Sequence, residues 1–252
     1  MNLLAIDTSS SWCSVALSFS DTTLQRHENV GPKASHFLLP WIQELLKEAH
    51  FDWHDLDALA VGIGPGAFTG VRLAVAVAQG LAYGADLPIL PVTSLDAMAA
   101  QAQLLPSFVA KKPKQMLVAL DARMGEVYWA SYDCTAASVD ALAKRLNPIS
   151  LCKPEAVDLR GADFLVGNAA KVYSDQMPLH LEADQIDSEL MPSALGVMLC
   201  AKSMAQRGEF VSVDQLEPLY VRNKVAFTTL ERAAGEGFAL AGDLGRKDSK
   251  RV

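Results

Sequence analysis

Two carboxylates stand at the ends of apolar runs in this sequence, where two-domain ATPases keep the carboxylates that hold metal-bound water. Asp7 follows the run Leu3–Ile6, and Asp121 follows the run Met116–Leu120. The residues after Asp7 are small and polar, so a phosphate could approach the backbone there. After Asp121, the side chains of Ala122–Met124 would block that approach, because close contact between backbone and phosphate needs glycine. The second loop is therefore the poorer phosphate site.

The other motifs with catalytic potential are weak. The glycine-rich stretch Gly64–Gly70 is not a P-loop, because it is followed by Val71 and Arg72 instead of Lys and Ser or Thr. Its free N–H groups at a helix start make only a weak anion site. The pair His50 and His54 does not form an HExxH zinc motif, and no GxSxG nucleophile motif is present. These patterns favour neither a metal centre nor a serine nucleophile.

The strands that would position the two carboxylates occur in two similar sets. Leu3–Ile6, Cys13–Phe19 and Thr22–Asn29 read as a β-meander. Met116–Leu120 and Glu126–Tyr132 repeat the order of apolar strand, Asp, tight turn and second strand. The repetition predicts a duplicated α/β architecture.

Two helices are predicted in the first half. Ser35–Ala49 has apolar residues at helical spacing, including Trp41. Gly70–Tyr83 is apolar or small around nearly its whole circumference, which is typical of a helix buried on more than one side. Two interpretations stay open: a helix sandwiched within its own domain, or one whose second face meets a partner protein.

Composition excludes several classes of protein. Half of the 252 residues are hydrophobic and 20% are charged, which argues against disorder. The formal net charge of −7 makes a broad nucleic-acid surface improbable on electrostatic grounds. No apolar stretch is long enough for a membrane span, and we expect no signal peptide. Four widely spaced cysteines without a CxxC pair indicate a reducing compartment, so we expect a cytoplasmic protein.

A polar stretch, Lys111–Lys114, is the candidate boundary between the two sets of strands. We expect an N-terminal half over residues 1–108, a C-terminal half over residues 109–221, and a mostly disordered tail over residues 222–252. The tail holds seven Lys and Arg against four Asp and Glu, so it is basic where the rest of the chain is acidic.

Four long motifs resemble the TsaB (YeaZ) family, in order from Met1 to about Phe227. They are LLAIDTSSSWCSVAL, GIGPGAFTGVRLAVAVAQGLAYGADLPILPVTSL, ALDARMGEVYWA and LEPLYVRNKVAF. The resemblance implies an actin/Hsp70/sugar-kinase (ASKHA) fold, with two related halves that are each a mixed sheet flanked by helices.

The resemblance also implies a role in forming N6-threonylcarbamoyladenosine at A37 of tRNAs that read ANN codons. In this family TsaB is the paralogue and partner of TsaD, which transfers the threonylcarbamoyl group, and TsaE is an ATPase that joins them. TsaD-like proteins hold a metal through an HxxxH motif, and Ser94 and Met98 stand at those positions here. Neither side chain replaces imidazole as a ligand. The resemblance therefore implies a non-catalytic subunit without a metal or cofactor of its own, with ATP or ADP only in the complex with TsaD and TsaE.

Site residues carried over from the family fall into two groups. The interface with TsaD, or with a second copy when TsaD is absent, is expected at Trp41, Leu45, Val71, Ala74, Val75 and Ala78. Vestigial nucleotide loops are expected at Asp7, Thr8, Ser9, Asp121 and Gly167. Contact with tRNA is expected only through the complex.

Two alternatives remain at this point. The chain could be an ATP-binding or peptidase-like enzyme of the glycoprotease superfamily that acts on its own. It could instead bind tRNA directly through the basic tail, although a short basic terminus is more often simply solvated.

Overall fold

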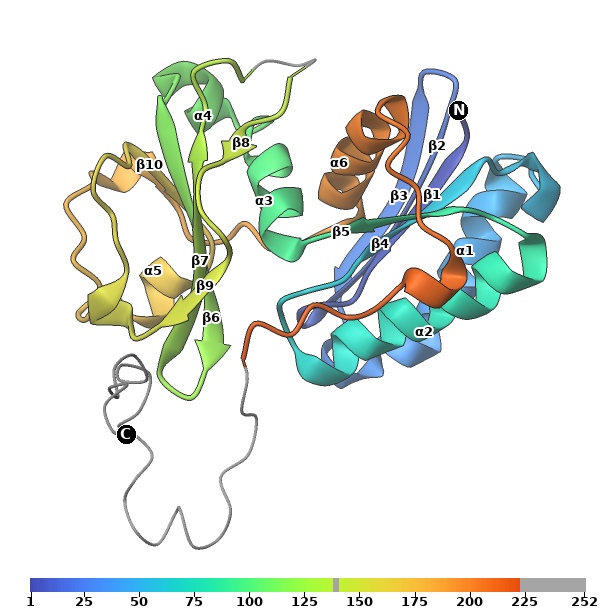
Figure 1. The fold of residues 1–252 in the computed structure, drawn as a ribbon, viewed down its shortest axis with the longest axis horizontal. Coiled ribbons are helices and arrows are strands. Elements are labelled where there is room, and N and C mark those ends of the chain that lie inside the picture. The colour runs from blue at the N-terminus through green and yellow to red at the C-terminus, as the bar shows by residue number, and fades with distance from the viewer. Residues whose placement is uncertain (138–140, 223–252) are drawn as a thin grey trace, which may run out of the picture. The chain divides into compact units, whose positions relative to one another are not determined.

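The computed structural model describes residues 1–137 and 141–222, and Met1–Val221 form one compact unit. Its first sheet has five strands in the order β3-β2-β1-β4-β5, with β1 to β3 antiparallel and β4 and β5 parallel to β1 (Figure 1). The bounds are β1 Leu3–Asp7, β2 Trp12–Phe19, β3 Thr22–Asn29, β4 Ala58–Gly62 and β5 Ile89–Val92.

The second sheet has six strands and repeats this plan. Strands β6 and β7 form an antiparallel hairpin, and β10 and β11 extend it in parallel from β6. Short strands β8 and β9 pair with the other edge of β7. The bounds are β6 Gln115–Arg123, β7 Glu126–Asp133, β8 Lys144–Arg145, β9 Ser150–Cys152, β10 Phe164–Val166 and β11 Ile186–Asp187. The predicted α/β fold class, with two related halves that are each a mixed sheet flanked by helices, is confirmed.

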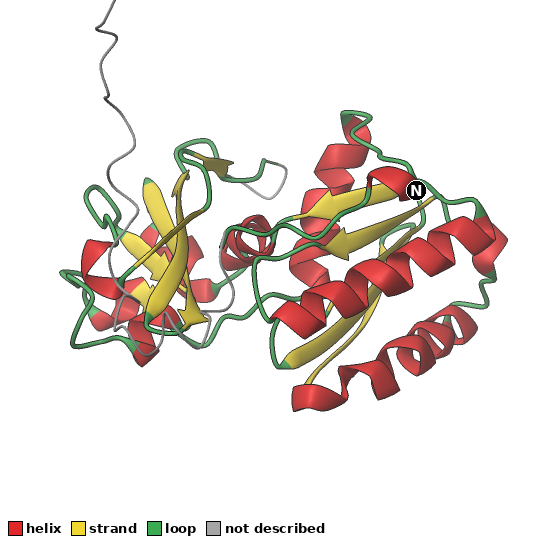
Figure 2. Ribbon diagram, turned by 60° about the horizontal axis from the view of Figure 1, so that its bottom comes forward, coloured by secondary structure: helices red, strands yellow, loops and turns green. Residues whose placement is uncertain are grey.

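Helices cover both faces of the first sheet. Alternate residues of β1 point to opposite faces, so Leu4 and Ile6 pack with α1 and α2, while Leu3 and Ala5 pack with α6. Figure 2 shows the two long helices across one face. The helices are α1 Ala34–Glu48, α2 Phe68–Ala85, α3 Ser94–Ala102, α4 Pro106–Lys111, α5 Ala169–Val172 and α6 Ala194–Gln206, with 3₁₀ turns at Gly31–Lys33, Trp53–Asp55, Pro154–Ala156, Ala183–Gln185 and Val213–Gln215.

The chain returns to the first sheet after the second is complete. Helix α6 packs on β1, β2, β4 and β5, and Val211 forms a β-bridge with Ile89. Residues 194–219, which fall inside the range expected for the C-terminal half, thus lie against the N-terminal sheet. The division at residue 108 stays a prediction, and the predicted tail lies outside the described residues except for Arg222.

Helices α3 and α6 cross closely. A Cβ atom on Gly196 would lie 2.3 Å from the carbonyl oxygen of Ala97, so only glycine fits at this point of α6. Helix α3 also packs on the second sheet through Leu95 and Met98. Among the described residues, no helix combines the length and the apolar character that a membrane crossing would need.

Candidate functional site

The first carboxylate, Asp7, is fully buried at the end of β1. Its Oδ1 atom accepts hydrogen bonds from the backbone N–H and the hydroxyl of Ser9, both at 2.9 Å. Ser94, the first residue of α3, donates its hydroxyl to Ser9 Oγ at 3.1 Å. Within the described chain, Asp7 Oδ2 has no hydrogen-bond partner. A buried polar chain therefore links the end of β1 to the start of α3.

The start of α2 fills the space beside this loop. The N–H of Ala67 donates to Ser9 O at 2.6 Å, and Thr8 Oγ1 donates to Gly70 O at 2.6 Å. A Cβ atom on Gly70 would lie only 1.9 Å from Thr8 O. The turn at Thr8 and Ser9, which was expected to be a vestigial nucleotide loop, is thus packed directly against the start of α2.

Burial makes Asp7 a weaker acid than an ordinary aspartic acid. Desolvation raises its pKa from 3.8 to about 6, and the two hydrogen bonds from Ser9 only partly oppose this shift. The folded chain consequently binds this proton more tightly than the unfolded chain does. The stabilisation that comes from tighter proton binding at Asp7 is fully present below the pKa of the unfolded chain and is lost as the pH rises through about 6.

This shift predicts a pH dependence that one substitution removes. The free energy of unfolding of the native chain should fall by about 1 kcal/mol more between pH 5 and pH 8 than that of Asp7→Asn. Urea unfolding at several pH values measures both slopes, and other titrating groups cancel in the comparison. Parallel slopes for the two proteins would contradict the assignment.

The second carboxylate, Asp121, is engaged by its own half of the molecule. Tyr173 donates its hydroxyl to Asp121 Oδ1 at 2.8 Å, and Arg123 forms an ion pair with Oδ2 at 3.2 Å. Burial and the neighbouring Asp121 raise the pKa of Tyr173 to about 12, so this hydroxyl stays protonated. Gly167 has a φ of +107°, and a Cβ atom there would lie 2.2 Å from Ala119 O. Tyr173 and Arg123 therefore engage the two carboxylate oxygens of Asp121 to which a metal-bound water would otherwise hydrogen-bond.

The positions matched to metal-binding histidines are also internal. Ser94 donates its N–H to Gly64 O at 2.8 Å, and its hydroxyl bonds to Ser9. Met98 lies fully buried in the core of the second sheet. Over residues 1–137 and 141–222, no group of three His, Cys, Asp or Glu side chains is placed to hold a metal ion.

The six residues expected at the partner interface lie inside the chain, and their role in an interface stays a prediction. All are buried in the chain alone, and all but Val71 belong to the apolar core that α1 and α2 form with the first sheet: Trp41, Leu45, Val71, Ala74, Val75 and Ala78. Helical spacing shows that residues share a face but not which neighbour covers that face. The sheet covers this one, which supports the interpretation of helices packed within their own domain.

The opposite face of α2 is exposed, and sequence reasoning did not single it out. It carries Arg72, Ala76, Gly80 and Tyr83, of which Tyr83 is 82% exposed. The sequence signal for it is that the polar residues of this helix, Arg72, Gln79 and Tyr83, fall on one narrow stripe. We call these four residues the α2 outer face.

A segment near the end of the described chain borders the α2 outer face. Gln79 donates to Leu216 O at 2.9 Å, and Tyr220 accepts a 2.7 Å hydrogen bond from Arg72 Nε. The Arg72 guanidinium also stacks 3.8 Å above the ring of Phe68, which is itself 45% exposed. A groove of about 560 Å³ runs between α2 and residues 214–220. The α2 outer face thus has small residues at its centre and Tyr83 at one end, and Phe68 flanks its other end beside Arg72.

Comparison with known proteins gives consistent matches. Residues 28–153 match the family model described as TsaD, tRNA N6-adenosine threonylcarbamoyltransferase. The tRNA threonylcarbamoyladenosine biosynthesis protein TsaB of Escherichia coli is 36% identical over 91% of this chain and 98% of that protein. TsaB of Haemophilus influenzae is 34% identical over 91% and 97%. The solved structure of YeaZ from Pseudomonas aeruginosa is 34% identical, with a TM-score of 0.76 over 87% of this chain and 99% of that one.

Proposed function

The chain belongs to the TsaB (YeaZ) family of tRNA threonylcarbamoyladenosine biosynthesis proteins, and from that premise we propose that it is a non-catalytic subunit that docks onto TsaD. The two loop carboxylates support this proposal most directly, because one is sealed beside α2 and the other is held by Arg123 and Tyr173. Ser94 and Met98 are buried as well. Within residues 1–137 and 141–222, neither carboxylate lies open to a substrate, so we assign the chain the role of holding TsaD in a competent arrangement.

We assign the docking to the α2 outer face. Small side chains at Ala76 and Gly80 let a partner helix approach closely, while Tyr83 and Phe68 offer aromatic area at either end. Buried residues of α1 and α2 position this face without touching the partner. When TsaD is absent, the same face pairs with a second copy of the chain in an isologous contact. TsaE joins the complex, in which ATP or ADP binds, and tRNA is contacted through the complex at A37 of tRNAs that read ANN codons.

A reconstituted modification reaction tests the non-catalytic role. Asp121→Asn should retain about half or more of the native rate of threonylcarbamoyladenosine formation when TsaD, TsaE and the activated donor are supplied. Mass spectrometry of the tRNA nucleosides measures the product, and omission of the chain is the control that should abolish it. A hundredfold loss in a folded Asp121→Asn chain would make the second loop catalytic.

A further inference from the structure

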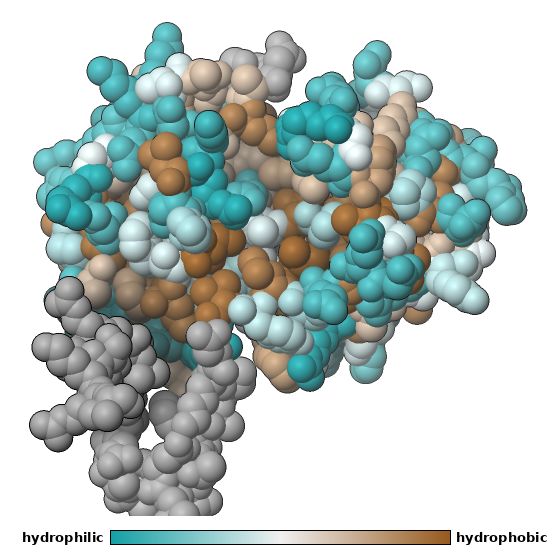
Figure 3. All heavy atoms as spheres, in the orientation of Figure 1, coloured by the Kyte–Doolittle hydropathy of each residue, from teal (hydrophilic) through white to brown (hydrophobic). Residues whose placement is uncertain are grey.

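A separate cavity of about 740 Å³ lies away from the α2 outer face. Its walls are the residues from the end of β5 into α3, the segment 141–145 that contains β8, and the last turns of α6. A hollow is visible near the top middle of Figure 3. The volume is within the range of small-molecule sites in proteins.

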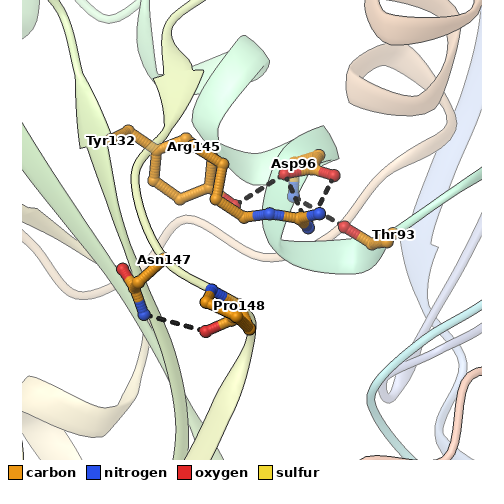
Figure 4. Close-up of polar contacts among 6 residues, drawn as sticks. All are labelled: Thr93, Asp96, Tyr132, Arg145, Asn147 and Pro148. Carbon is orange, nitrogen blue, oxygen red and sulfur yellow. Dashed lines mark hydrogen bonds and ion pairs between the residues drawn. The ribbon is translucent and has the colours of Figure 1, made fainter.

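A fixed polar centre stands in the wall of this cavity. Tyr132 donates its hydroxyl to Asp96 Oδ1 at 2.8 Å, and Arg145 Nη1 contacts both oxygens of Asp96 at 3.0 and 3.2 Å (Figure 4). Burial and the adjacent Asp96 raise the pKa of Tyr132, so the phenol stays a neutral donor. In the free protein, Arg145 therefore balances the charge of Asp96, and Tyr132 donates a hydrogen bond to it.

The segment that carries Arg145 is itself held in place. Asn147 accepts the N–H of Ser131 on β7 at 2.8 Å and donates to Pro148 O at 2.8 Å. The N–H of Leu146 donates to Ser131 O. These bonds fix the backbone just after Arg145, which reduces the ordering cost of binding.

The charges in the wall leave a positive excess. Three cations, Lys144, Arg145 and Arg207, face two carboxylates, Asp96 and Glu209. Arg145 neutralises Asp96, and Arg207 pairs with Glu209 at 2.6 Å. Asp96 engages only Nη1 of Arg145, and Lys144 makes no ion pair within the residues that the structure describes. Asp133, the register partner of Lys144 on β7, interacts electrostatically with Lys144, which helps to lower the pKa of Asp133, but Asp133 does not line the cavity.

The rest of the lining is largely apolar. Pro91, Val92, Ala100, Leu142 and Met204 contribute hydrocarbon surface beside the cationic groups. We propose that the cavity binds a small organic oxyanion, with its charged head on Lys144 and Arg145 and its apolar body against these side chains. This site is independent of docking to TsaD, because none of its residues belongs to the α2 outer face.

A matched set of ligands tests the proposal on the full chain. Titration calorimetry at low salt compares 2-naphthoate and 2-naphthyl phosphate with uncharged 2-naphthamide, which shares the same aromatic body. At least one anion should bind about tenfold more tightly than the amide, and Lys144→Gln should weaken that anion by about tenfold. Whether carboxylate or phosphate is preferred identifies the head group.

Two variants serve as controls. Lys47→Gln, which makes the same charge change on the exposed side of α1, should bind the anion as the native chain does. Ala76→Arg, which alters the α2 outer face, should also retain binding, so failure of the docking proposal would not affect this test. Equal affinity for the amide and both anions, equal loss in Lys144→Gln and Lys47→Gln, or no binding at all would overturn the proposal.

Discussion

Ala76→Arg should leave the chain folded and weaken its association with TsaD about a hundredfold, whereas Ala74→Arg should unfold it. The two alanines stand two residues apart on α2 and face opposite ways: Ala74 is 0% exposed in the core, and Ala76 lies on the α2 outer face. An arginine at residue 74 would bury an unpaired charge, which costs several kcal/mol. At residue 76 the guanidinium reaches water, so folding is spared while close approach of a partner helix is blocked.

Two measurements separate these effects. Circular dichroism and urea unfolding should give native-like values for Ala76→Arg and a lost or strongly weakened transition for Ala74→Arg. Surface plasmon resonance against immobilised TsaD should show affinity reduced by about a hundredfold for Ala76→Arg. Native affinity in that variant would move the docking surface away from α2.

Gly196→Ala should destabilise the chain by about 3 kcal/mol, although alanine is the better helix former. The new Cβ would lie 2.3 Å from the backbone oxygen of Ala97, which cannot move without shifting α3. Because α6 packs on the first sheet and α3 also packs on the second, the crossing of these helices is a main contact between the halves.

Gly80→Ala is the matched control for this prediction. Gly80 lies in the middle of α2, and a Cβ atom there would meet nothing within 4 Å. The same substitution should therefore stabilise the isolated chain by about 0.5–1 kcal/mol through helix propensity. Urea titration measures the free energy of unfolding of both variants. A Gly196→Ala chain as stable as the native one would show that the crossing of α3 and α6 can relax.

Local pattern was sufficient to predict the duplicated architecture. The apolar strands that end at Asp7 and Asp121 are β1 and β6, and each begins an antiparallel hairpin as expected. Strand periodicity and turn residues are properties of short segments, so they can be read without knowledge of tertiary contacts.

Contacts between distant segments could not be predicted in this way. The spacing on α2 defined a face through Ala74 and Ala78, but the position of the sheet decides that this face is internal. Tyr173 satisfies Asp121 from 52 residues away, and no local signal marks that pair. The cavity beside Arg145 likewise depends on three separate segments meeting.

The complex with TsaD from the same organism provides the most direct test of the central claim. Size-exclusion chromatography with light scattering should show a one-to-one complex for the native chain, together with no ATP or peptide hydrolysis by the chain alone. If the chain does not bind TsaD and hydrolyses ATP or a peptide by itself, it is an independent enzyme and the account is wrong.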